Sequence, residues 1–220
     1  MYNYVGDSMK VSGSILTDKM DTKKAVKLMN EYNVDYIHVD IMDGKFVPNK
    51  SFTIKDIYNL SSYTNKELDI HLMVNNPLKY IDDLSMLNTK YITFHYEAVK
   101  NIDGVIDKIK SNGLKVGLSI KPNTSVNDIE KYLSKVDLIL VMSVEPGKSG
   151  QIFMDSVIYK TEVLNRLRKE NNYNYIISID GGIDDISFEK IKNNVDMVVS
   201  SSYILSGNGL DKVNNFKNSI

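Results

Sequence analysis

Two residues that can ligate a metal stand two positions apart in the stretch 36–49, which reads YIHVDIMDGKFVPN. Its first part, residues 36–42, alternates apolar and polar residues, and this period of two indicates a β-strand. His38 and Asp40 therefore leave the same face of the strand, and Met42 continues that row. An imidazole beside a carboxylate can bind a divalent cation. A solvent-facing strand edge would also account for the pair, so the rest of the chain has to decide.

Further polar side chains follow other apolar segments of the chain. The sequence contains three histidines, and each stands at or near the end of a segment with a strand pattern. Two imidazoles and two carboxylates could together bind one divalent metal ion: His38, Asp40, His71 and Asp180. This donor set suits zinc, iron(II), manganese or cobalt rather than magnesium or calcium, which prefer oxygen ligands alone. The alternative for His71 is a core histidine satisfied by a carbonyl group, and His95 is a weaker candidate because Glu97 could hold its ring.

Three methionines fall at positions that would face the interior at the same level: Met42, Met73 and Met142. Methionine often fills gaps in a core, which is one interpretation of these residues. The other is an apolar, polarizable wall that excludes water above a reactive carbanion. The residues alone leave both interpretations open.

Glycine-rich segments follow the apolar runs 138–144 and 175–179, and serines follow the run 197–199. The glycines are Gly147, Gly150, Gly181 and Gly182. They could serve only to permit tight turns. Alternatively, exposed backbone amides of these segments form an anion site, which barrels of parallel strands often use for phosphate. The pattern GxGxxG is absent, so nothing indicates a dinucleotide.

Strand and helix patterns alternate regularly along the chain. Strands are predicted at 11–16, 36–42, 68–74, 91–94, 116–120, 138–144, 175–179 and 197–199. Apolar residues at helical spacing predict the connecting helices. Examples are Ala25, Leu28, Met29 and Tyr32, then Val126, Ile129 and Leu133, and finally Leu210, Val213 and Phe216.

Strict alternation of strand and helix predicts an α/β protein with parallel strands and helical crossovers. Eight such units, with no linker or shift in composition between them, predict a single-domain (β/α)8 TIM barrel over residues 1–220. A doubly wound open sheet is the alternative, and eight regular repeats favour closure. In such a barrel the site lies at the C-terminal ends of the strands, where the polar residues named above are expected to gather.

The composition argues against several other classes of protein. The chain has 220 residues and a formal net charge of -1, which lacks the broad basic field of a protein that binds nucleic acid or membranes. It has no cysteine, so disulfides and thiolate chemistry are excluded. No apolar run approaches membrane-spanning length, and the first residues show no secretory signal. We expect a soluble, cytoplasmic protein that binds neither nucleic acid nor membrane.

Five segments resemble, in order, the signature segments of the ribulose-phosphate 3-epimerase family: IHVDIMDGKFVPN, DIHLMV, ITFHYEA, LVMSVEPGKSGQIF and SIDGGI. The resemblance extends from the first predicted strand to the eighth. It implies a (β/α)8 barrel and an isomerase of the pentose phosphate pathway that interconverts D-ribulose 5-phosphate and D-xylulose 5-phosphate. It also implies a phosphorylated ketose as the substrate, one bound divalent metal ion and a homo-oligomer.

The resemblance also implies roles for individual residues. Those matching the metal ligands of the family are His38, Asp40, His71 and Asp180. Asp40 and Asp180 also match its two acid/base groups, and His71 is expected to contact the substrate as well. The other residues expected at the substrate are Ser14, Met42, Met73, Met142, Gly147, Gly150, Gly181, Gly182, Ser201 and Ser202.

Three departures from the family pattern concern the rim of the substrate site and its phosphate pocket. Gly13 stands where the family usually carries proline, and Ser201 stands where it usually carries glycine. Lys148 and Ser149 replace an aromatic residue and a glycine. The reaction type is therefore better determined than the substrate, and 3-epimerisation of another phosphoketose, such as D-allulose 6-phosphate, is the alternative.

Two functions outside this class are alternatives. A non-catalytic barrel that binds phosphosugars is one, although a binder would have no reason to keep both Asp40 and Asp180 beside two histidines. A decarboxylase of the orotidine-phosphate type is the other, and it is disfavoured because Met42 occupies the place of the lysine that its motif needs.

Overall fold

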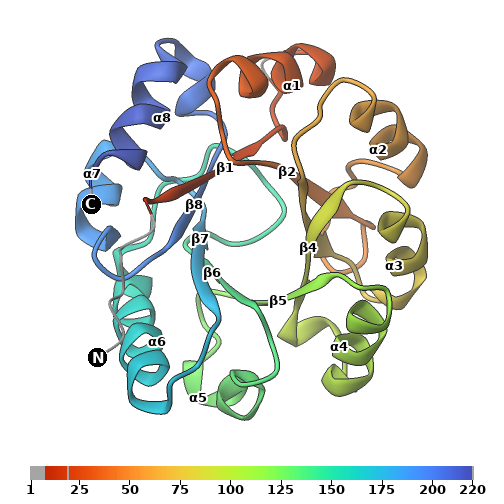
Figure 1. Ribbon diagram of the computed structural model, residues 1–220, viewed down its shortest axis with the longest axis vertical. Helices are drawn as coiled ribbons and strands as arrows, with labels where there is room; N and C mark the ends of the chain where they lie inside the picture. Colours follow the sequence, from red (N-terminus) through yellow and green to blue (C-terminus); the bar gives the residue numbers. More distant parts are fainter. Residues whose placement is uncertain (1–7, 19, 220) are drawn as a thin grey trace.

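The computed structural model describes residues 8–18 and 20–219, in which eight parallel strands form a closed barrel in sequence order (Figure 1). The eighth strand pairs with the first and closes the ring. The strands are β1 Lys10–Ser14, β2 Tyr36–Met42, β3 Leu68–Met73, β4 Thr89–His95, β5 Lys115–Ile120, β6 Leu138–Met142, β7 Ile176–Asp180 and β8 Met197–Ser200. The predicted (β/α)8 barrel is confirmed, and the open sheet is excluded.

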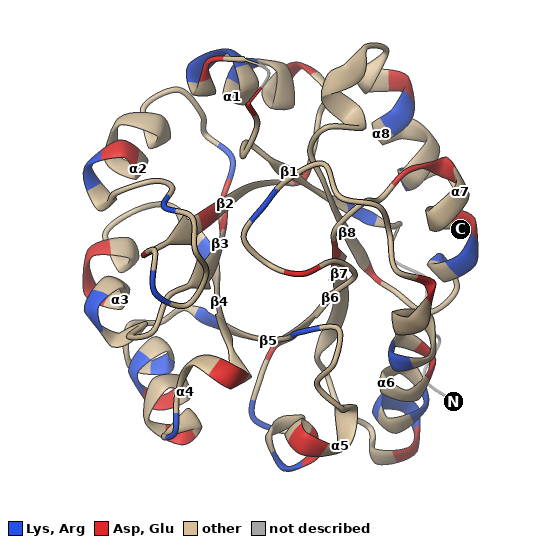
Figure 2. Cartoon of the chain, turned by 180° about the vertical axis from the view of Figure 1, so that it is seen from behind, with Lys and Arg blue, Asp and Glu red and all other residues tan. Residues whose placement is uncertain are grey.

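A helix follows each strand and lies on the outside of the barrel (Figure 1). The helices are α1 Thr22–Glu31, α2 Ile54–Ser61, α3 Leu78–Ser85, α4 Ile102–Ser111, α5 Val126–Ile129, α6 Ile158–Asn171, α7 Asp185–Ile191 and α8 Gly209–Lys217. Figure 2 shows charged residues of both signs interspersed around this outer ring. No helix within the described residues is both long and apolar enough to cross a membrane.

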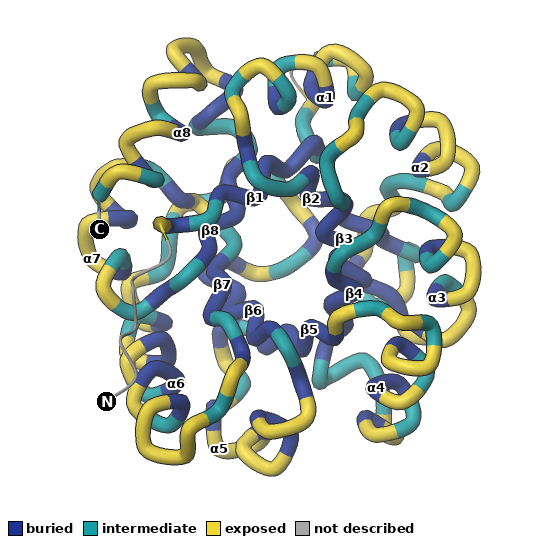
Figure 3. Tube along the Cα trace, in the orientation of Figure 1, coloured by how far each residue is buried: buried dark blue, intermediate teal, exposed yellow. Residues whose placement is uncertain are grey.

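The strands are buried on both faces over most of their length, which is dark blue in Figure 3. All six residues of β3, LDIHLM, are buried. Ile70 and Leu72 belong to the main core beneath the helices. The alternate residues Asp69, His71 and Met73 therefore point into the barrel, because successive side chains of a strand leave opposite faces. Polar residues inside such a strand are costly to bury and indicate a site.

Two strand ends differ from the predicted bounds in a way that shapes the site. Strand β7 continues to Asp180, one residue beyond the predicted range 175–179, and there pairs with Met142 and Val199. Strand β6 stops at Met142 instead of continuing to 144. The hydroxyl of Ser143 donates to the carbonyl oxygens of Asp180 and Gly181, at 2.8 and 2.6 Å, which turns the chain out of the sheet.

Two of the predicted helices also differ from expectation. The helix predicted over 126–133 is one α-turn followed by a 3-10 turn, Glu130–Tyr132, and Tyr132 is buried there. In α8 the residue expected in the buried stripe, Leu210, is 45% exposed. Gly209 faces the core in its place, because a Cβ at Gly209 would lie 2.2 Å from the ring of Tyr32.

The domain predicted over 1–220 includes residues 1–7, 19 and 220, which lie outside the described ranges. Its exact extent therefore stays a prediction. The closed barrel itself accounts for the position of the site, because all eight strands end at the same mouth.

Candidate active site

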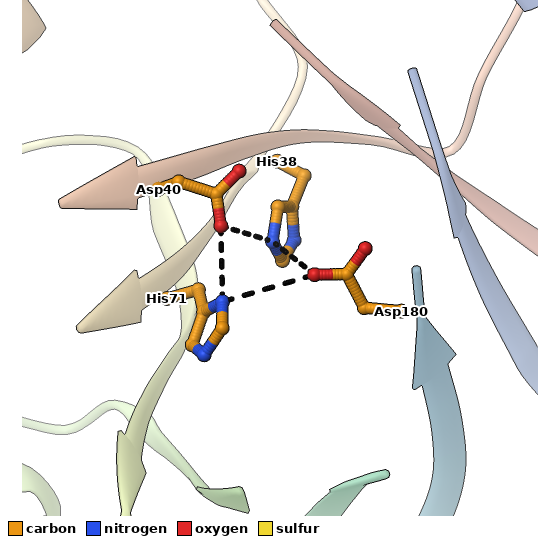
Figure 4. Close-up of side chains that lie close together, drawn as sticks. All are labelled: His38, Asp40, His71 and Asp180. Carbon is orange, nitrogen blue, oxygen red and sulfur yellow. Dashed lines mark hydrogen bonds and ion pairs between the residues drawn. The ribbon is translucent and has the colours of Figure 1, made fainter. Parts of the chain in front are cut away.

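Four side chains that can ligate a metal meet at the C-terminal ends of the strands (Figure 4). His38 and Asp40 occupy alternate positions of β2, His71 lies beside Asp40 on β3, and Asp180 ends β7. One ligand atom of each lies within 4.8 Å of the others. Asp40 Oδ1 is 3.3 Å from His38 Nε2 and 3.0 Å from His71 Nδ1. Asp180 Oδ2 is 3.9 Å from both of these nitrogens.

The ring of His38 supplies a test of whether this cluster suits a metal. The residue is completely buried, and its Nε2 has no hydrogen-bond partner. Its Nδ1 lies 2.7 Å from Oδ2 of Asp69. An ionised carboxylate only accepts, so in the neutral ring the proton is on Nδ1 and the lone pair of Nε2 faces Asp40 and Asp180. A cation satisfies such a buried group of acceptors, and two nitrogens with two carboxylates fit zinc or its transition-metal neighbours.

The charges within the cluster shift the pKa values of its carboxyl groups in opposite directions. Burial would raise the pKa of Asp40, but His38 and His71 outweigh it by charge and hydrogen bonding and hold this pKa well below its usual range. Burial, and then the charge of Asp40, raise the pKa of Asp180 to about 6. Burial would lower the pKa of His38, but Asp40 and Asp69 outweigh it and raise this pKa. The cluster thus contains two carboxyl groups with distinct proton affinities.

A pocket opens beside the cluster at the mouth of the barrel, and Asp40 and Asp180 line it. His38 and His71 are completely buried and are not among the residues that line it. All the other residues predicted at the substrate line this pocket: Ser14, Met42, Met73, Met142, Gly147, Gly150, Gly181, Gly182, Ser201 and Ser202. Sequence reasoning therefore selected residues that the fold brings together, and their individual roles remain predictions.

The three departures from the family pattern do not all lie at the pocket. Lys148, Ser149 and Ser201 line it. Gly13 does not, and a Cβ built on it would lie 2.5 Å from Sδ of Met29 on α1. The small residue at this position therefore accommodates the packing of α1 against the barrel, which corrects the expectation that it borders the substrate.

The methionines fill the core and line the pocket at the same time. Met42 and Met73 are neighbours across β2 and β3 and pack with Val47. Met142 is the neighbour of Asp180 across β6 and β7. Each is at most 5% exposed. Both interpretations offered by the sequence therefore describe the same side chains.

The glycine-rich segments adopt backbone conformations that favour glycine. Gly147 and Gly182 have φ angles of 108° and 66°. A Cβ on Gly182 would also lie 2.4 Å from the backbone nitrogen of Phe153. The carbonyl of Gly147 accepts a hydrogen bond of 2.8 Å from Asn49 Nδ2. The loop between β6 and α6 consequently extends over the mouth of the barrel to the loop that follows β2 (Figure 1).

Asp69 is a residue of the site that the sequence interpretation missed. Its Oδ2 accepts from the hydroxyl of Ser12 at 2.7 Å, besides contacting Nδ1 of His38 at 2.7 Å. Asp69 is 2% exposed. A signal was present in the chain, because Asp69 is a charged residue two positions before His71 in an otherwise apolar strand and so shares its face.

His95 also has a larger part in the site than the sequence indicated. The residue is completely buried, and its Nε2 lies 2.9 Å from Nε2 of His71. Its Nδ1 lies 3.1 Å from Oε2 of Glu97. Burial lowers the pKa of His95 to about 4, so the ring is neutral at pH 7. Burial would raise the pKa of Glu97, but hydrogen bonds from His95, Lys121 N–H and Thr124 lower it to about 2.

Residues 10–205 match the model of the ribulose-phosphate 3 epimerase family. Similar proteins named ribulose-phosphate 3-epimerase occur in bacteria, archaea and yeast. The one from Treponema pallidum is 37% identical over 185 residues, which are 84% of this chain and 85% of that protein. The one from Methanocaldococcus jannaschii is 37% identical, with 89% and 84% covered. The one from Schizosaccharomyces pombe is 38% identical, with 79% and 76% covered.

Two solved structures with a similar fold have much lower sequence identity to this chain. A tryptophan synthase structure from Mycobacterium tuberculosis has a TM-score of 0.69 and 12% identity, covering 96% of this chain and 91% of that chain. A mutant tryptophan synthase alpha-subunit from Pyrococcus furiosus has a TM-score of 0.69 and 10% identity, covering 97% and 96%. At such identities the likeness concerns the barrel fold alone.

Proposed function

Because this chain belongs to the ribulose-phosphate 3-epimerase family, we infer that it interconverts D-ribulose 5-phosphate and D-xylulose 5-phosphate by inverting C3. The enzyme is an isomerase. The observation that carries this function is the meeting of two carboxylates and two imidazoles beside one pocket. Inverting a carbon next to a ketone requires removing a proton from one face and returning a proton to the other. Two carboxylates on either side of that carbon can do both.

We propose that Asp40 and Asp180 are the groups that move the proton. They come from β2 and β7 and both border the pocket, so a substrate carbon held between them would have one carboxylate on each face. Whichever carboxylate is ionised accepts the C3 proton, and the other returns a proton to the opposite face of the enediolate.

We propose that the four-residue cluster holds one divalent metal ion through His38, Asp40, His71 and Asp180. The lone pair of His38 Nε2, buried without a hydrogen-bond partner among acceptors, supports this proposal. When bound, such an ion would act as a Lewis acid that stabilises negative charge on the substrate oxygens, an effect worth several kcal/mol. Zinc, iron(II), manganese and cobalt all suit the donor set, and metal analysis of the purified protein would decide among them.

The remaining pocket residues bind and shield the substrate. Met42, Met73 and Met142 form an apolar wall beside the carboxylates, and this wall would keep water away from the carbanion formed at C3. The glycine loops after β6 and β7, with Ser201 and Ser202 after β8, would bind the phosphate through backbone amides and hydroxyls. Phosphate binding then contributes orientation of C3 rather than chemistry.

A hexose substrate is the second candidate. Lys148, Ser149 and Ser201 depart from the family pattern and all border the pocket, where they would contact the substrate. These residues bear on which phosphoketose fits, and they leave the acid/base groups unchanged. D-allulose 6-phosphate is therefore tested beside D-ribulose 5-phosphate.

The test is solvent isotope exchange. The metal-loaded protein is incubated in deuterated water with each sugar phosphate, and NMR follows deuterium at C3 together with the epimeric product. We expect fast turnover of the pentose, and a loss of about 10²–10⁴-fold in kcat for Asp180→Asn. Asp211→Asn, an exposed aspartate at the start of α8, is the matched control and should retain full activity.

Each other outcome excludes a part of the proposal. Preference for the hexose would keep the mechanism and replace the substrate. Tight binding of either sugar phosphate without exchange at C3 would identify a non-catalytic binder. Full activity of Asp180→Asn would remove Asp180 from the acid/base pair.

We also propose that the enzyme acts in the cytoplasm as a homo-oligomer. The lack of cysteine suits a reducing compartment, and the association of copies is an expectation from the family. Sedimentation equilibrium of the full chain measures the second point, and a monomer at micromolar concentration would contradict it.

A further inference from the structure

A series of three side chains, which starts at His71, leads away from the four-residue cluster. His71 Nε2 lies 2.9 Å from His95 Nε2, and His95 Nδ1 lies 3.1 Å from Glu97 Oε2. Both histidines are completely buried. We propose that Glu97 is a positioning residue that, through His95, determines which nitrogen of His71 is free to ligate the metal. The inference rests on the metal site proposed above.

Each contact in this series determines which nitrogen of the next ring carries the proton. An ionised carboxylate only accepts, so Glu97 requires the proton of neutral His95 to be on Nδ1. The Nε2 of His95 is then an acceptor, and the 2.9 Å contact requires His71 to donate from Nε2. Nδ1 is then the nitrogen of His71 that can ligate a metal, once the proton that it shares with the carboxylate of Asp40 is lost. That atom lies 3.0 Å from Asp40 and 3.9 Å from Asp180, where a metal would be bound.

Glu97 is itself held by the loop between β5 and α5. Its Oε1 accepts from the backbone N–H of Lys121 at 2.8 Å and from the hydroxyl of Thr124. With Oε1 bound to the loop and Oε2 facing His95, the carboxylate has one orientation. The proton order along the series is therefore built into the protein before a metal binds.

Lys160 of α6 holds the same loop through its backbone carbonyl groups. This lysine is 1% exposed, and its ammonium group donates to the carbonyls of Lys121, Pro122 and Thr124, at 2.9, 2.6 and 2.6 Å. Three bonds to successive parts of one loop leave it little freedom. The loop consequently presents its donors to Glu97 at a fixed position.

An isosteric substitution reverses the proton order. In Glu97→Gln, the donors of Lys121 and Thr124 hold the amide oxygen, which turns the amide N–H towards His95 Nδ1. His95 must then accept at Nδ1 and carry its proton on Nε2. His71 must accept at Nε2 and carry its proton on Nδ1, the nitrogen that faces the metal. Binding a metal would now require breaking this arrangement.

The test reads the tautomers directly. The full chain contains only three histidines, so long-range ¹H–¹⁵N NMR of labelled protein resolves each ring nitrogen. Without added metal, the wild type should carry a proton on His71 Nε2 and on His95 Nδ1. In Glu97→Gln, His71 Nε2 should carry no proton, and the proton of His95 should be on Nε2. Zinc affinity, measured by competition with a chromogenic chelator, should fall about 10–100-fold.

Two further variants separate the effect of Glu97 on the tautomers from a general effect of substitution on the protein. Thr124→Val keeps the charge of Glu97 and removes one of its donors, so it should weaken zinc binding by less than Glu97→Gln does. Glu67→Gln neutralises a half-exposed carboxylate, paired with Lys90, and should leave both tautomers and affinity unchanged. Circular dichroism confirms that each variant is folded.

The results that would contradict this inference are different from those that would contradict the proposed epimerase function. Unchanged tautomers in folded Glu97→Gln would overturn the inference, whether or not the enzyme is active. Unchanged zinc affinity in that variant, with reversed tautomers, would also overturn it. A wild type that shows the expected tautomers but exchanges no deuterium at C3 would contradict the epimerase function alone.

Discussion

The two histidines of the cluster present different nitrogens to its centre. His38 directs Nε2 and His71 directs Nδ1 towards Asp40. In each ring the other nitrogen contacts a group outside the pocket, Asp69 for His38 and His95 for His71. The metal-binding ability of the site therefore depends on Asp69 and His95 as well as on the ligands, because these two residues determine the tautomers of His38 and His71.

Substituting Asp69 tests whether the residue that contacts Nδ1 of His38 affects metal binding. In Asp69→Asn the amide oxygen can still accept from His38 Nδ1, but the negative charge that makes the ring a stronger ligand is lost. We expect zinc affinity to fall about 10–100-fold, measured by chelator competition, with little change in the free energy of unfolding. Ser12→Ala is the graded control, because it removes one donor to Asp69 and keeps the charge. An equal loss in both variants would show that the effect does not come from the charge of Asp69.

The four candidate ligands could be predicted from the sequence because strand alternation places every second residue on one face. The residues that contact these ligands from neighbouring strands could not be predicted in this way. The contact of His95 with His71 joins neighbouring strands β3 and β4, and their register shifts between Leu68 and Asp69. Such contacts depend on register and loop shape, which local patterns do not specify.

At the level of elements, one arginine ties three of them together near the end opposite the site. Arg168 of α6 donates to the carbonyl of Tyr175 at 3.1 Å and pairs with the carboxylate of Asp196. Oδ2 of Asp196 also accepts from the backbone N–H of Ile177 at 2.6 Å. Helix α6 is thereby fixed to the chain segments that enter β7 and β8, and Asp180 stands at the other end of β7.

Removing this tie should destabilise the whole barrel. Arg168→Met leaves the partly buried carboxylate of Asp196 without its cation, at a cost of about 3 kcal/mol in the free energy of unfolding. Arg166→Met, on the same helix, breaks only the exposed pair with Glu170 and should cost at most about 0.5 kcal/mol. Urea unfolding followed by circular dichroism compares the two. Equal costs would show that the loss comes from helix α6 rather than from the buried tie.

The elements themselves were predictable to different degrees. All eight strands were found because parallel strands buried on both faces give short apolar runs between turn signals. The length of α5 was wrong, and so was the burial of Leu210 in α8, whereas Val213 and Phe216 are buried as predicted. A glycine was not expected on the buried face of α8, yet Gly209 is required there by the nearby ring of Tyr32. Close approach of this kind is a tertiary effect that overrides helical periodicity.

For the molecule as a whole, the buried tyrosines determine how stability depends on alkaline pH. Tyr175 is 1% exposed, and its hydroxyl donates to the carbonyl of Leu164 at 2.7 Å. Burial raises the pKa of Tyr175 above that of an exposed tyrosine, which is about 10. Above that pH the unfolded chain loses the phenolic proton while the folded protein keeps it. Stability therefore falls as pH rises, because the unfolded state then binds fewer protons.

Tyr175→Phe should remove this part of the pH dependence. At pH 8 the variant should be less stable than wild type by about 1 kcal/mol, because it lacks the hydrogen bond to Leu164. Above about pH 10 the wild type should lose up to about 1.4 kcal/mol more per pH unit than the variant, so the difference shrinks and then reverses. Lys160, whose pKa is lowered by burial, acts in the opposite direction, but equally in both proteins. Urea unfolding at several pH values measures the difference, with Tyr159→Phe, a 53% exposed tyrosine, as control. Curves for Tyr175→Phe and wild type that stay parallel up to pH 11 would show that Tyr175 ionises as readily in the folded barrel as in the unfolded chain.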